Sequence, residues 1–400
     1  MSTRQSRKRA RATRPAARQT ATIATGAVAA VGVGIVAVGV GTIFAGLVRA
    51  AFRAERAVDD GPDDLLTVPA DAPRRRWVRT VDGARLNVET YGPDGDMTDG
   101  GTAGRGTSTD GDTASDGDIV VMVHGWTCNI AYWYPQINHL ASKREVVAYD
   151  QRGHGSSDLG RARPTIAMLG QDLDAVLSEV VPEGRRAVLV GHSMGGMTIM
   201  SWAAQHPEKV GSFVSEVVLT STAAKAVMQN HLLIPVDLPR YTKPFEATVG
   251  KLVTSAPVPL PRTNRGSRLS HYIALGPNAR KAHVDFVDEM IMACPPRSRA
   301  GWGSAMGKLD VTAGLEALTV PTTVVVGTDD RLTPPLHSEQ MADVLRRNGN
   351  LRDLVILDGV GHMSSIEADV RYNELLDGVL ADTTRTDDPV SSSATSTASS

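Results

Sequence analysis

The clearest chemical signal in the sequence lies around Ser193, in the stretch Gly191-His-Ser-Met-Gly195. An apolar run from Val188 to Val190 precedes this stretch, and a helix-forming run from Met197 to His206 follows it. A serine on a tight turn between a buried strand and a helix is exposed at the carboxyl end of a sheet, with the first helix amides directed towards it. Glycine is needed on both sides because a side chain there would crowd the strained turn. The pattern predicts that Ser193 is a nucleophile, although an ordinary glycine-serine turn would contain the same pentapeptide.

A serine hydroxyl becomes an effective nucleophile only when a base removes its proton and an acid orients that base. Among the ten histidines, position favours His362, which follows the last apolar strand and precedes the final helix. That places it on the same rim of the sheet as Ser193. Asp329 and Asp330 directly follow an apolar strand and reach the same rim, so on position alone either residue fits the acid.

Three further histidines stand near strand ends but fit structural roles better. His192 is next to the nucleophile and is expected to point to another side of the turn. His124 and His154 follow strands, and we expect them to stabilise turns through hydrogen bonds to the backbone.

Acyl transfer from an ester passes through an oxyanion, which two preorganised hydrogen-bond donors must stabilise. The amide of Met194 is the first expected donor, because it directly follows the nucleophile. The second should come from the loop after the strand that ends before His124, and the amide of Trp126 is the best candidate.

Strands and helices alternate along the chain in a way that places these residues on one rim. Continuous apolar strands between helices predict a mostly parallel sheet covered on both faces. Before them, two alternating runs flank Asp82-Gly83, which predicts a hairpin with a two-residue type I′ turn. The expected strands are Trp77 to Val81, Ala84 to Tyr91, Ile119 to Val123, Arg144 to Tyr149, Ala187 to Val190, Val217 to Thr220, Thr322 to Val326 and Leu354 to Leu357, with helices at Thr165 to Val181 and around Met341 to Leu345.

The alternation is interrupted between residues 223 and 318. This region is too long for a loop and lacks strand signals, so we predict a helical cap or lid over the strand ends. It includes a helix from about Pro277 to Cys294. Its apolar residues would favour an acyl chain or another apolar substrate, unless they pack on the core; they are Leu232, Leu233, Ile234, Phe286, Met290 and Met292.

With these motifs in place, the chain resembles the α/β-hydrolase superfamily over about residues 75–380. In that family the acid usually stands three residues after the glycine that closes its strand, which implies Asp330 rather than Asp329. The resemblance implies an α/β-hydrolase core at residues 75–222 and 319–381, with the cap inserted before the acid-bearing strand. It is carried by His124-Gly125, Asp150-Gln-Arg-Gly-His-Gly155, Gly191-His-Ser-Met-Gly195, Gly327-Thr-Asp-Asp330 and Gly361-His362, in that order.

The expected function is hydrolysis of a carboxylic ester with an apolar acyl group or a lipid-like character, through an acyl-enzyme and without a cofactor or metal. Ser193 would attack, His362 would transfer the proton and Asp330 would orient His362. Serine at the turn argues against the superfamily's epoxide hydrolases and haloalkane dehalogenases, which use aspartate there. The alternatives are a haloperoxidase-like activity or a C–C bond hydrolase on the same triad, or a membrane-tethered binding protein without catalysis.

The N-terminus has a charge pattern of its own. Residues 1–20 are basic, and residues 21–48 carry no charge and are long enough to span a bilayer as a helix. We predict an uncleaved signal anchor with residues 1–20 in the cytoplasm and the catalytic domain outside the cell membrane. Cleavage as a secretory signal, which would release a secreted enzyme, is the alternative. Arg49, Arg53 and Arg56 on the far side weaken the predicted orientation.

The remaining composition limits the other function classes. Lys and Arg number 42 against 44 Asp and Glu, and the basic N-terminus is explained by membrane topology, so no nucleic-acid partner is expected. Cys128 and Cys294 fit no metal spacing, and two separate buried thiols are favoured over a disulfide. Residues 49–74 are interpreted as a linker, and the polar residues 93–118 and 382–400 are expected to be a disordered insertion and tail.

Overall fold

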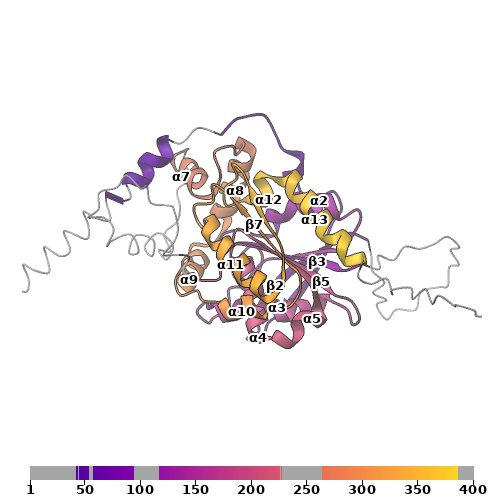
Figure 1. The fold of residues 1–400 in the computed structure, drawn as a ribbon. Helices are drawn as coiled ribbons and strands as arrows, with labels where there is room; N and C mark the ends of the chain where they lie inside the picture. The colour runs from indigo at the N-terminus through magenta and orange to yellow at the C-terminus, as the bar shows by residue number, and fades with distance from the viewer. Residues whose placement is uncertain are drawn as a thin grey trace, which may run out of the picture.

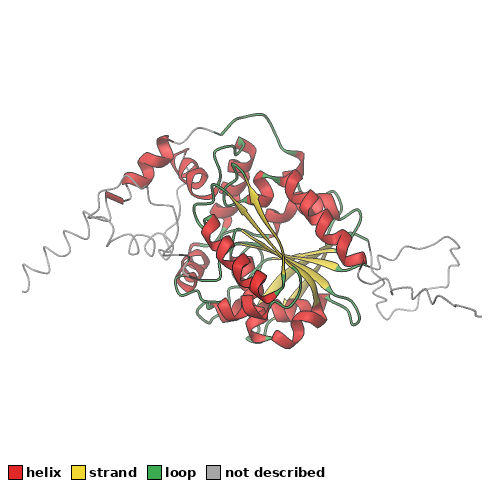
Figure 2. Cartoon of the chain, in the orientation of Figure 1, coloured by secondary structure: helices red, strands yellow, loops and turns green. Residues whose placement is uncertain are grey.

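The computed structural model describes residues 42–43, 45–53, 57–93, 117–225, 227 and 264–385. Within these residues the chain forms one eight-stranded sheet in the order β1-β2-β4-β3-β5-β6-β7-β8, which twists through the centre of the molecule (Figure 2). The first two strands pair antiparallel, and β4, β3 and β5 to β8 run parallel to one another. The strands are β1 Arg74–Arg79, β2 Arg85–Tyr91, β3 Ile119–Val123, β4 Val146–Tyr149, β5 Ala187–His192, β6 Val214–Thr220, β7 Thr322–Gly327 and β8 Leu351–Leu357.

Helices cover both faces of the sheet. The helices α3, α4, α10 and α11 pack on one face, and α2, α12 and α13 pack on the other (Figure 1). The helices are α2 Tyr134–Leu140, α3 Ile166–Val180, α4 Met194–Gln205, α5 Val210–Phe213, α7 Asn264–Ala274, α8 Lys281–Ala293, α9 Pro296–Met306, α10 Thr312–Ala317, α11 Pro335–Asn348, α12 Ser364–Glu367 and α13 Asp369–Arg385, with short 3-10 turns at Asp64–Leu66, Ile130–Trp133 and Pro207–Lys209.

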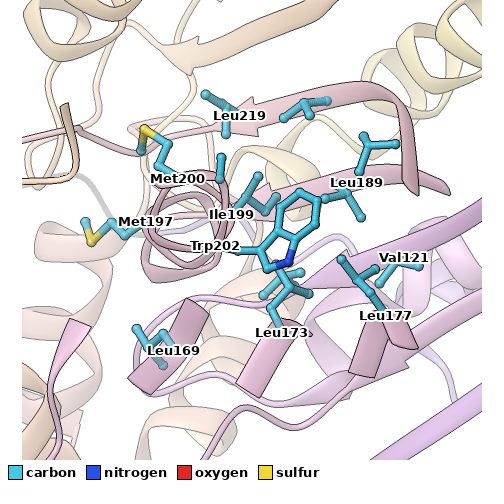
Figure 3. Close-up of a cluster of buried hydrophobic side chains, with 14 of the residues drawn as sticks. Val121, Leu169, Leu173, Leu177, Leu189, Met197, Ile199, Met200, Trp202 and Leu219 are labelled. Carbon is cyan, nitrogen blue, oxygen red and sulfur yellow. The ribbon is translucent and has the colours of Figure 1, made fainter. Parts of the chain in front are cut away.

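Two hydrophobic clusters follow from the alternation of side chains along each strand. In β3, Val121 belongs to the cluster under α3 and α4, and its neighbour Met122 belongs to the cluster on the opposite face. Trp202 of α4 is fully buried between Leu173 of α3 and Leu189 of the sheet (Figure 3). Truncation of such a side chain typically costs about 3 to 5 kcal/mol of stability. This packing holds α4, and with it the turn at its first residue, firmly on the sheet.

The six apolar runs predicted from Ile119 onwards all form strands, and the mostly parallel sheet covered on both faces is confirmed. The boundaries differ where the pairing extends further than the apolar pattern. β8 begins at Leu351, three residues before the predicted strand, because its first residues pair with β7. The final helix continues to Arg385, four residues into the segment that the sequence indicated as a tail.

The predicted hairpin forms, but its turn differs from the prediction. The amide of Thr80 donates to the carbonyl of Ala84, and the amide of Gly83 donates to that of Thr80, both at 2.9 Å. Three residues therefore form the loop, rather than two. A type I′ turn needs positive φ at two central residues, and here only Gly83 has it, at 83°.

Between β6 and β7 the described residues form α7, α8, α9 and α10. Leu232, Leu233 and Ile234, which the sequence assigned to the cap, lie outside the described residues. Met290 is buried in the core cluster below α8, so it packs on the fold. Phe286 and Met292 are half-buried.

The predicted membrane anchor at residues 21–48 lies outside the described residues except for 42–43 and 45–48, and so does most of the predicted insertion, residues 94–116. None of the helices among the described residues combines the length and the apolar character needed to cross a bilayer. Membrane attachment therefore stays a prediction from the sequence.

The segment interpreted as a linker is bound to the cap helices. A helix at residues 45–53 lies beside α7 (Figure 1), and the guanidinium of Arg268 donates to the carbonyls of Ala51 and Phe52 at 3.3 and 3.0 Å. Further along, the amide of Lys281 donates to the carbonyl of Val58 at 2.8 Å. The cap is thus held from both sides, by the core and by the preceding chain.

Candidate active site

Ser193 alone forms the turn between β5 and α4, because β5 ends at His192 and α4 begins at Met194. Its backbone has φ 52° and ψ −115°, a conformation that residues with a side chain rarely adopt and that costs about 1 to 3 kcal/mol. Hydrogen bonds to the end of β6 hold it there: the amide of Ser193 donates to the carbonyl of Thr220 at 2.9 Å, and the hydroxyl of Thr222 donates to the carbonyl of Ser193 at 2.7 Å. The predicted nucleophile turn is therefore present.

The glycines around this turn make room for close backbone contacts. A Cβ on Gly191 would lie 2.6 Å from a methyl of Ile199 and 2.8 Å from the backbone of Gly195. A Cβ on Gly125 would lie 2.6 Å from the ring of His192 and 3.1 Å from the Cβ of Ser193. The loop after β3 thus passes directly against the nucleophile.

Ser193, His362 and Asp330 form a hydrogen-bonded chain. Nε2 of His362 lies 3.0 Å from Oγ of Ser193, and Nδ1 lies 3.0 and 2.9 Å from the two carboxylate oxygens of Asp330. An ionised carboxylate only accepts hydrogen bonds, so Nδ1 carries the proton and Nε2 is free to accept the proton of Ser193. All three side chains are buried, with exposed fractions of 8% for Ser193, 4% for His362 and 1% for Asp330.

The structure separates the two aspartates that position alone left equivalent. Asp330 binds His362 and also accepts hydrogen bonds from the amides of Leu332 and Thr333, both at 2.9 Å, and from the hydroxyl of Thr333 at 2.8 Å. The carboxylate of Asp329 accepts instead from the hydroxyl of Thr328 at 3.0 Å. Asp330, as the family resemblance implied, is therefore the residue in contact with the histidine.

The two predicted oxyanion donors are the amides of Trp126 and Met194. Within the described residues, neither amide donates a hydrogen bond to the protein. Met194 is the first residue of α4, where amides lack a partner inside the helix. The indole of Trp126 donates to the carbonyl of Arg299 in α9 at 3.0 Å, which ties its loop to the cap.

Two of the remaining histidines stabilise turns, as expected. Nε2 of His124 accepts from the amide of Gln151 at 2.9 Å, and Nε2 of His154 accepts from the amide of Thr127 at 3.2 Å. Both rings are buried, and burial lowers the pKa of His124 to about 4 and that of His154 to about 3. They remain neutral at physiological pH and hold the loop that carries Trp126.

His192 contacts the backbone of the catalytic histidine and the ring of Tyr132. Its Nε2 donates to the backbone carbonyl of His362 at 3.0 Å, and its ring stacks on Tyr132 with centroids 4.2 Å apart. Burial lowers the pKa of His192 well below its usual value. A neutral ring with the proton on Nε2 satisfies this contact.

Two residues near the site were not identified from the sequence. Thr333 bridges the acid and the base, since its hydroxyl lies 2.8 Å from Asp330 and 3.3 Å from Nδ1 of His362. Glu367 accepts hydrogen bonds from the amides on both sides of His362. The available signals were the Asp-x-x-Thr spacing, typical of a side-chain turn, and an acidic residue five positions after the histidine.

The cysteines form neither a disulfide nor a metal site among the described residues. Cys128 and Cys294 are both free and buried, as favoured from the sequence, and burial raises the pKa of Cys128 to about 12 and that of Cys294 to about 11. No group of three or more His, Cys, Asp or Glu side chains in the described part of the chain is arranged to hold a metal ion.

Comparisons with known proteins agree with this geometry. The profile of the family described as serine aminopeptidase, S33, matches residues 115–369. RutD of Variovorax paradoxus, to which a carbamate hydrolase activity is ascribed, is 30% identical over 280 residues, covering 66% of this chain and 92% of RutD. The 3-oxoadipate enol-lactonase 2 of Acinetobacter baylyi is 24% identical over 281 residues, covering 66% of this chain and 90% of that protein.

Among solved structures, a thermophilic esterase from Thermogutta terrifontis superimposes with a TM-score of 0.58 at 21% identity, covering 78% of this chain and 99% of the esterase. That similarity concerns the fold. The family profile covers more than half of the chain and includes the nucleophile turn, the acid and the histidine. The chain therefore belongs to the α/β-hydrolase superfamily, within the family described as serine aminopeptidase, S33.

Proposed function

We propose that this protein is a serine hydrolase that cleaves carboxylic esters through an acyl-enzyme. The observation that carries the proposal is the hydrogen-bonded chain from Asp330 through His362 to Ser193, with the hydroxyl at 3.0 Å from its base. The amides of Trp126 and Met194, which donate no hydrogen bond within the described part of the chain, would supply the oxyanion donors that acyl transfer requires.

In the acylation step, Oγ of Ser193 attacks the ester carbonyl carbon while Nε2 of His362 takes the hydroxyl proton. The carbonyl oxygen becomes an oxyanion held by the amides of Trp126 and Met194. Asp330 stabilises the imidazolium that forms. When the tetrahedral intermediate collapses, the C–O bond of the ester breaks, and the proton passes from His362 to the leaving alcohol.

In the deacylation step, a water molecule takes the place of the alcohol. Nε2 of His362 removes a proton from that water as its oxygen attacks the acyl carbon. The second tetrahedral intermediate collapses, Ser193 leaves with the proton from His362, and the carboxylic acid is released. The same residues thus serve both halves of the reaction.

Ester cleavage is one of several chemistries named among the relatives, beside carbamate hydrolysis and haloperoxidation. A lactone is a cyclic ester, and a lactonase is among the proteins that match nearly the whole catalytic region. We propose an apolar or lipid-like acyl group, because the half-buried side chains of Phe286 and Met292 belong to a helix of the cap. Phe286 lies 6.3 Å from the ring of Tyr134, measured between centroids, so the two aromatic rings are neighbours.

The location of the enzyme is proposed from its sequence. Residues 21–48 are uncharged and follow a basic segment, so we propose that they anchor the chain in the cell membrane with the catalytic domain outside. Membrane fractionation and protease accessibility of intact cells test this independently of activity. Recovery of the full-length chain in the soluble fraction would contradict it.

The test of the reaction is hydrolysis of p-nitrophenyl esters from short to long acyl chains by the full chain and by its Ser193→Ala variant. We expect turnover in the first and a loss of at least about 1,000-fold in kcat in the second. The acyl length that gives the highest kcat/KM defines the preferred substrate class. A fluorophosphonate probe should label the wild-type protein and not the variant.

The outcomes separate ester cleavage from its alternatives. Fluorophosphonate labelling without turnover of any ester would show that the serine is reactive but would contradict an ester substrate. It would favour carbamate hydrolysis, perhydrolysis or C–C bond cleavage. A folded protein that neither labels nor turns over would contradict catalysis and favour a binding protein on this fold.

A further inference from the structure

A second carboxylate, that of Glu367, lies next to the catalytic histidine but belongs to none of the groups that act in the proposed reaction. Glu367 is the last residue of α12, five positions after His362. The residue retains some exposed surface, but its carboxylate is surrounded by protein, and burial raises its pKa to about 7. Such a group is costly to bury unless its hydrogen bonds are satisfied.

The hydrogen bonds of Glu367 connect two parts of the fold. One carboxylate oxygen accepts from the amide of Gly276 at 2.7 Å and from that of Gly361 at 3.1 Å. The other accepts from Gly361 at 3.1 Å and from Met363 at 3.2 Å. Gly361 and Met363 flank His362, and Gly276 lies in the connector between the cap helices α7 and α8. The carboxylate therefore joins the cap connector to the histidine loop.

The end of α7 makes further contacts with the same histidine loop. The amides of His362 and Met363 donate to the carbonyl of Ala274, the last residue of α7, at 3.0 and 3.2 Å. Carbonyls at the end of a helix have no partner inside it, and here the histidine loop supplies the missing donors. The cap helix thus reaches the base of the triad through its own terminus.

The acid loop is connected to the end of α7 as well. The guanidinium of Arg331, which follows Asp330, donates to the carbonyls of Tyr272 and Leu275 at 3.1 and 3.3 Å. It also lies over the ring of Tyr272, 4.7 Å from the centroid. Both triad loops are therefore attached to one helix end.

Close glycine contacts prevent the connector and the histidine loop from moving independently. A Cβ on Gly276 would lie 2.6 Å from the carbonyl oxygen of Gly359. A Cβ on Gly361 would collide with the amide nitrogen of Gly276. Backbone therefore packs on backbone, and a shift of the cap connector must shift the loop that carries His362.

We infer that Glu367 is a positioning residue that couples the cap to the catalytic histidine, so that the placement of the α7–α8 connector sets the alignment of His362 with Ser193. This inference rests on the proposed hydrolase function for its kinetic consequence. The coupling itself is a property of the fold and is measurable without turnover.

The substitution that tests this coupling is Glu367→Gln. Above pH 7 the carboxylate of Glu367 is ionised and accepts at both oxygens, whereas an amide side chain presents N–H groups on one side. In Glu367→Gln, at least one of the three backbone amides faces another donor and loses its partner. Glu367→Asp keeps two acceptor oxygens on a shorter side chain and serves as the conservative variant.

The matched control is Glu216→Gln. Glu216 is also buried and is paired with Arg352 at 2.6 Å, but it lies near the start of β6, at the end of the sheet opposite the site. Its replacement removes a buried carboxylate from the same fold without touching the histidine loop. Any loss that follows from general destabilisation should appear in both variants.

Steady-state kinetics on the best p-nitrophenyl ester and hydrogen-deuterium exchange are measured on the full chain and all three variants. For Glu367→Gln we expect kcat to fall about 10- to 100-fold with KM changed less than about threefold, since misalignment of a base costs rate more than binding. Glu367→Asp should recover part of kcat, and Glu216→Gln should retain wild-type kcat. Amide exchange should accelerate at residues 274–277 and 360–363 together in Glu367→Gln alone.

The coupling would be overturned by unchanged kcat and exchange in Glu367→Gln, or by equal losses in Glu216→Gln. Accelerated exchange on only one of the two segments would also contradict it, because the carboxylate would then support a single loop. If the wild-type chain neither turns over esters nor reacts with a fluorophosphonate, the proposed function fails. The exchange experiment still decides the coupling in that case.

Discussion

The carbonyl oxygen of Val123 occupies the space that a side chain on Gly195 would need. A Cβ built on Gly195 would collide with that oxygen. Val123 ends β3 and Gly195 is the second residue of α4, so the start of the helix rests directly on the end of the neighbouring strand. The same close packing continues into the loop after β3, where a Cβ on Gly125 would lie 3.1 Å from the Cβ of Ser193.

Replacement of Gly195 by alanine should therefore disrupt the nucleophile turn. We expect Gly195→Ala to lower kcat at least about 100-fold, or to prevent folding, because neither backbone has room to move. Gly378→Ala is the control, since nothing lies within 4 Å of a Cβ there and alanine in a helix typically adds about 0.5 to 1 kcal/mol. Ester kinetics and thermal unfolding provide the readouts, and wild-type turnover in Gly195→Ala would contradict the close contact.

The two adjacent aspartates offer a matched pair for testing the acid. Asp330→Asn should lower kcat by about 10,000-fold, because an amide next to Nδ1 favours the wrong tautomer of His362. Asp329→Asn should change kcat less than about twofold, since its carboxylate contacts Thr328 instead. Comparable losses in both variants, measured on the same ester, would mean that the acid has been misassigned.

Stability should decrease as the pH falls from about 6.5 to 4. The pKa of His124 is lowered to about 4 and that of His154 to about 3 in the fold, so the unfolded chain binds more protons in this window. Each histidine then removes up to about 1.4 kcal/mol of unfolding free energy per pH unit. Glu367 acts in the opposite sense, because its raised pKa of about 7 gives a contribution that is lost as the pH rises from 4.5 to 7.

Urea unfolding at several pH values measures this slope. The loss of unfolding free energy from the two buried histidines exceeds the gain from Glu367. We therefore expect the free energy of unfolding to decrease on acidification. His154→Asn should flatten the slope. A pH-independent free energy of unfolding would show that these rings are not held neutral.

Arg280 is a further residue that attaches the N-terminal segment to the cap. Its guanidinium pairs with the carboxylates of Asp60 and Asp63, both at 2.6 Å. We expect Arg280→Ala to cost about 1 kcal/mol and to speed amide exchange across residues 57–66, because the pairs are partly exposed. Arg346→Ala, which removes an exposed pair with Asp343, is the control and should leave exchange in that segment unchanged.

Much of the catalytic arrangement was predictable because it depends on local pattern. The glycine-flanked Ser193 directly follows a continuous run of apolar residues. The end of that run marks the carboxyl end of the strand, so the position of Ser193 on the sheet rim follows from the sequence. The same reasoning placed His362 on that rim. The hairpin was predicted for the same reason, but its turn was not, since Asp82-Gly83 is compatible with a two-residue or a three-residue loop and the backbone angles decide between them.

Tertiary contacts distinguish residues that the local sequence pattern could not tell apart. Asp329 and Asp330 are neighbours on one loop, and only the packing of the histidine loop determines which carboxylate meets Nδ1. The role inferred for Glu367 is of the same kind, because its partners are backbone amides from segments about 90 residues apart. Backbone amides carry no residue type, so a sequence pattern does not reveal where they converge, whereas the folded chain brings them to one carboxylate.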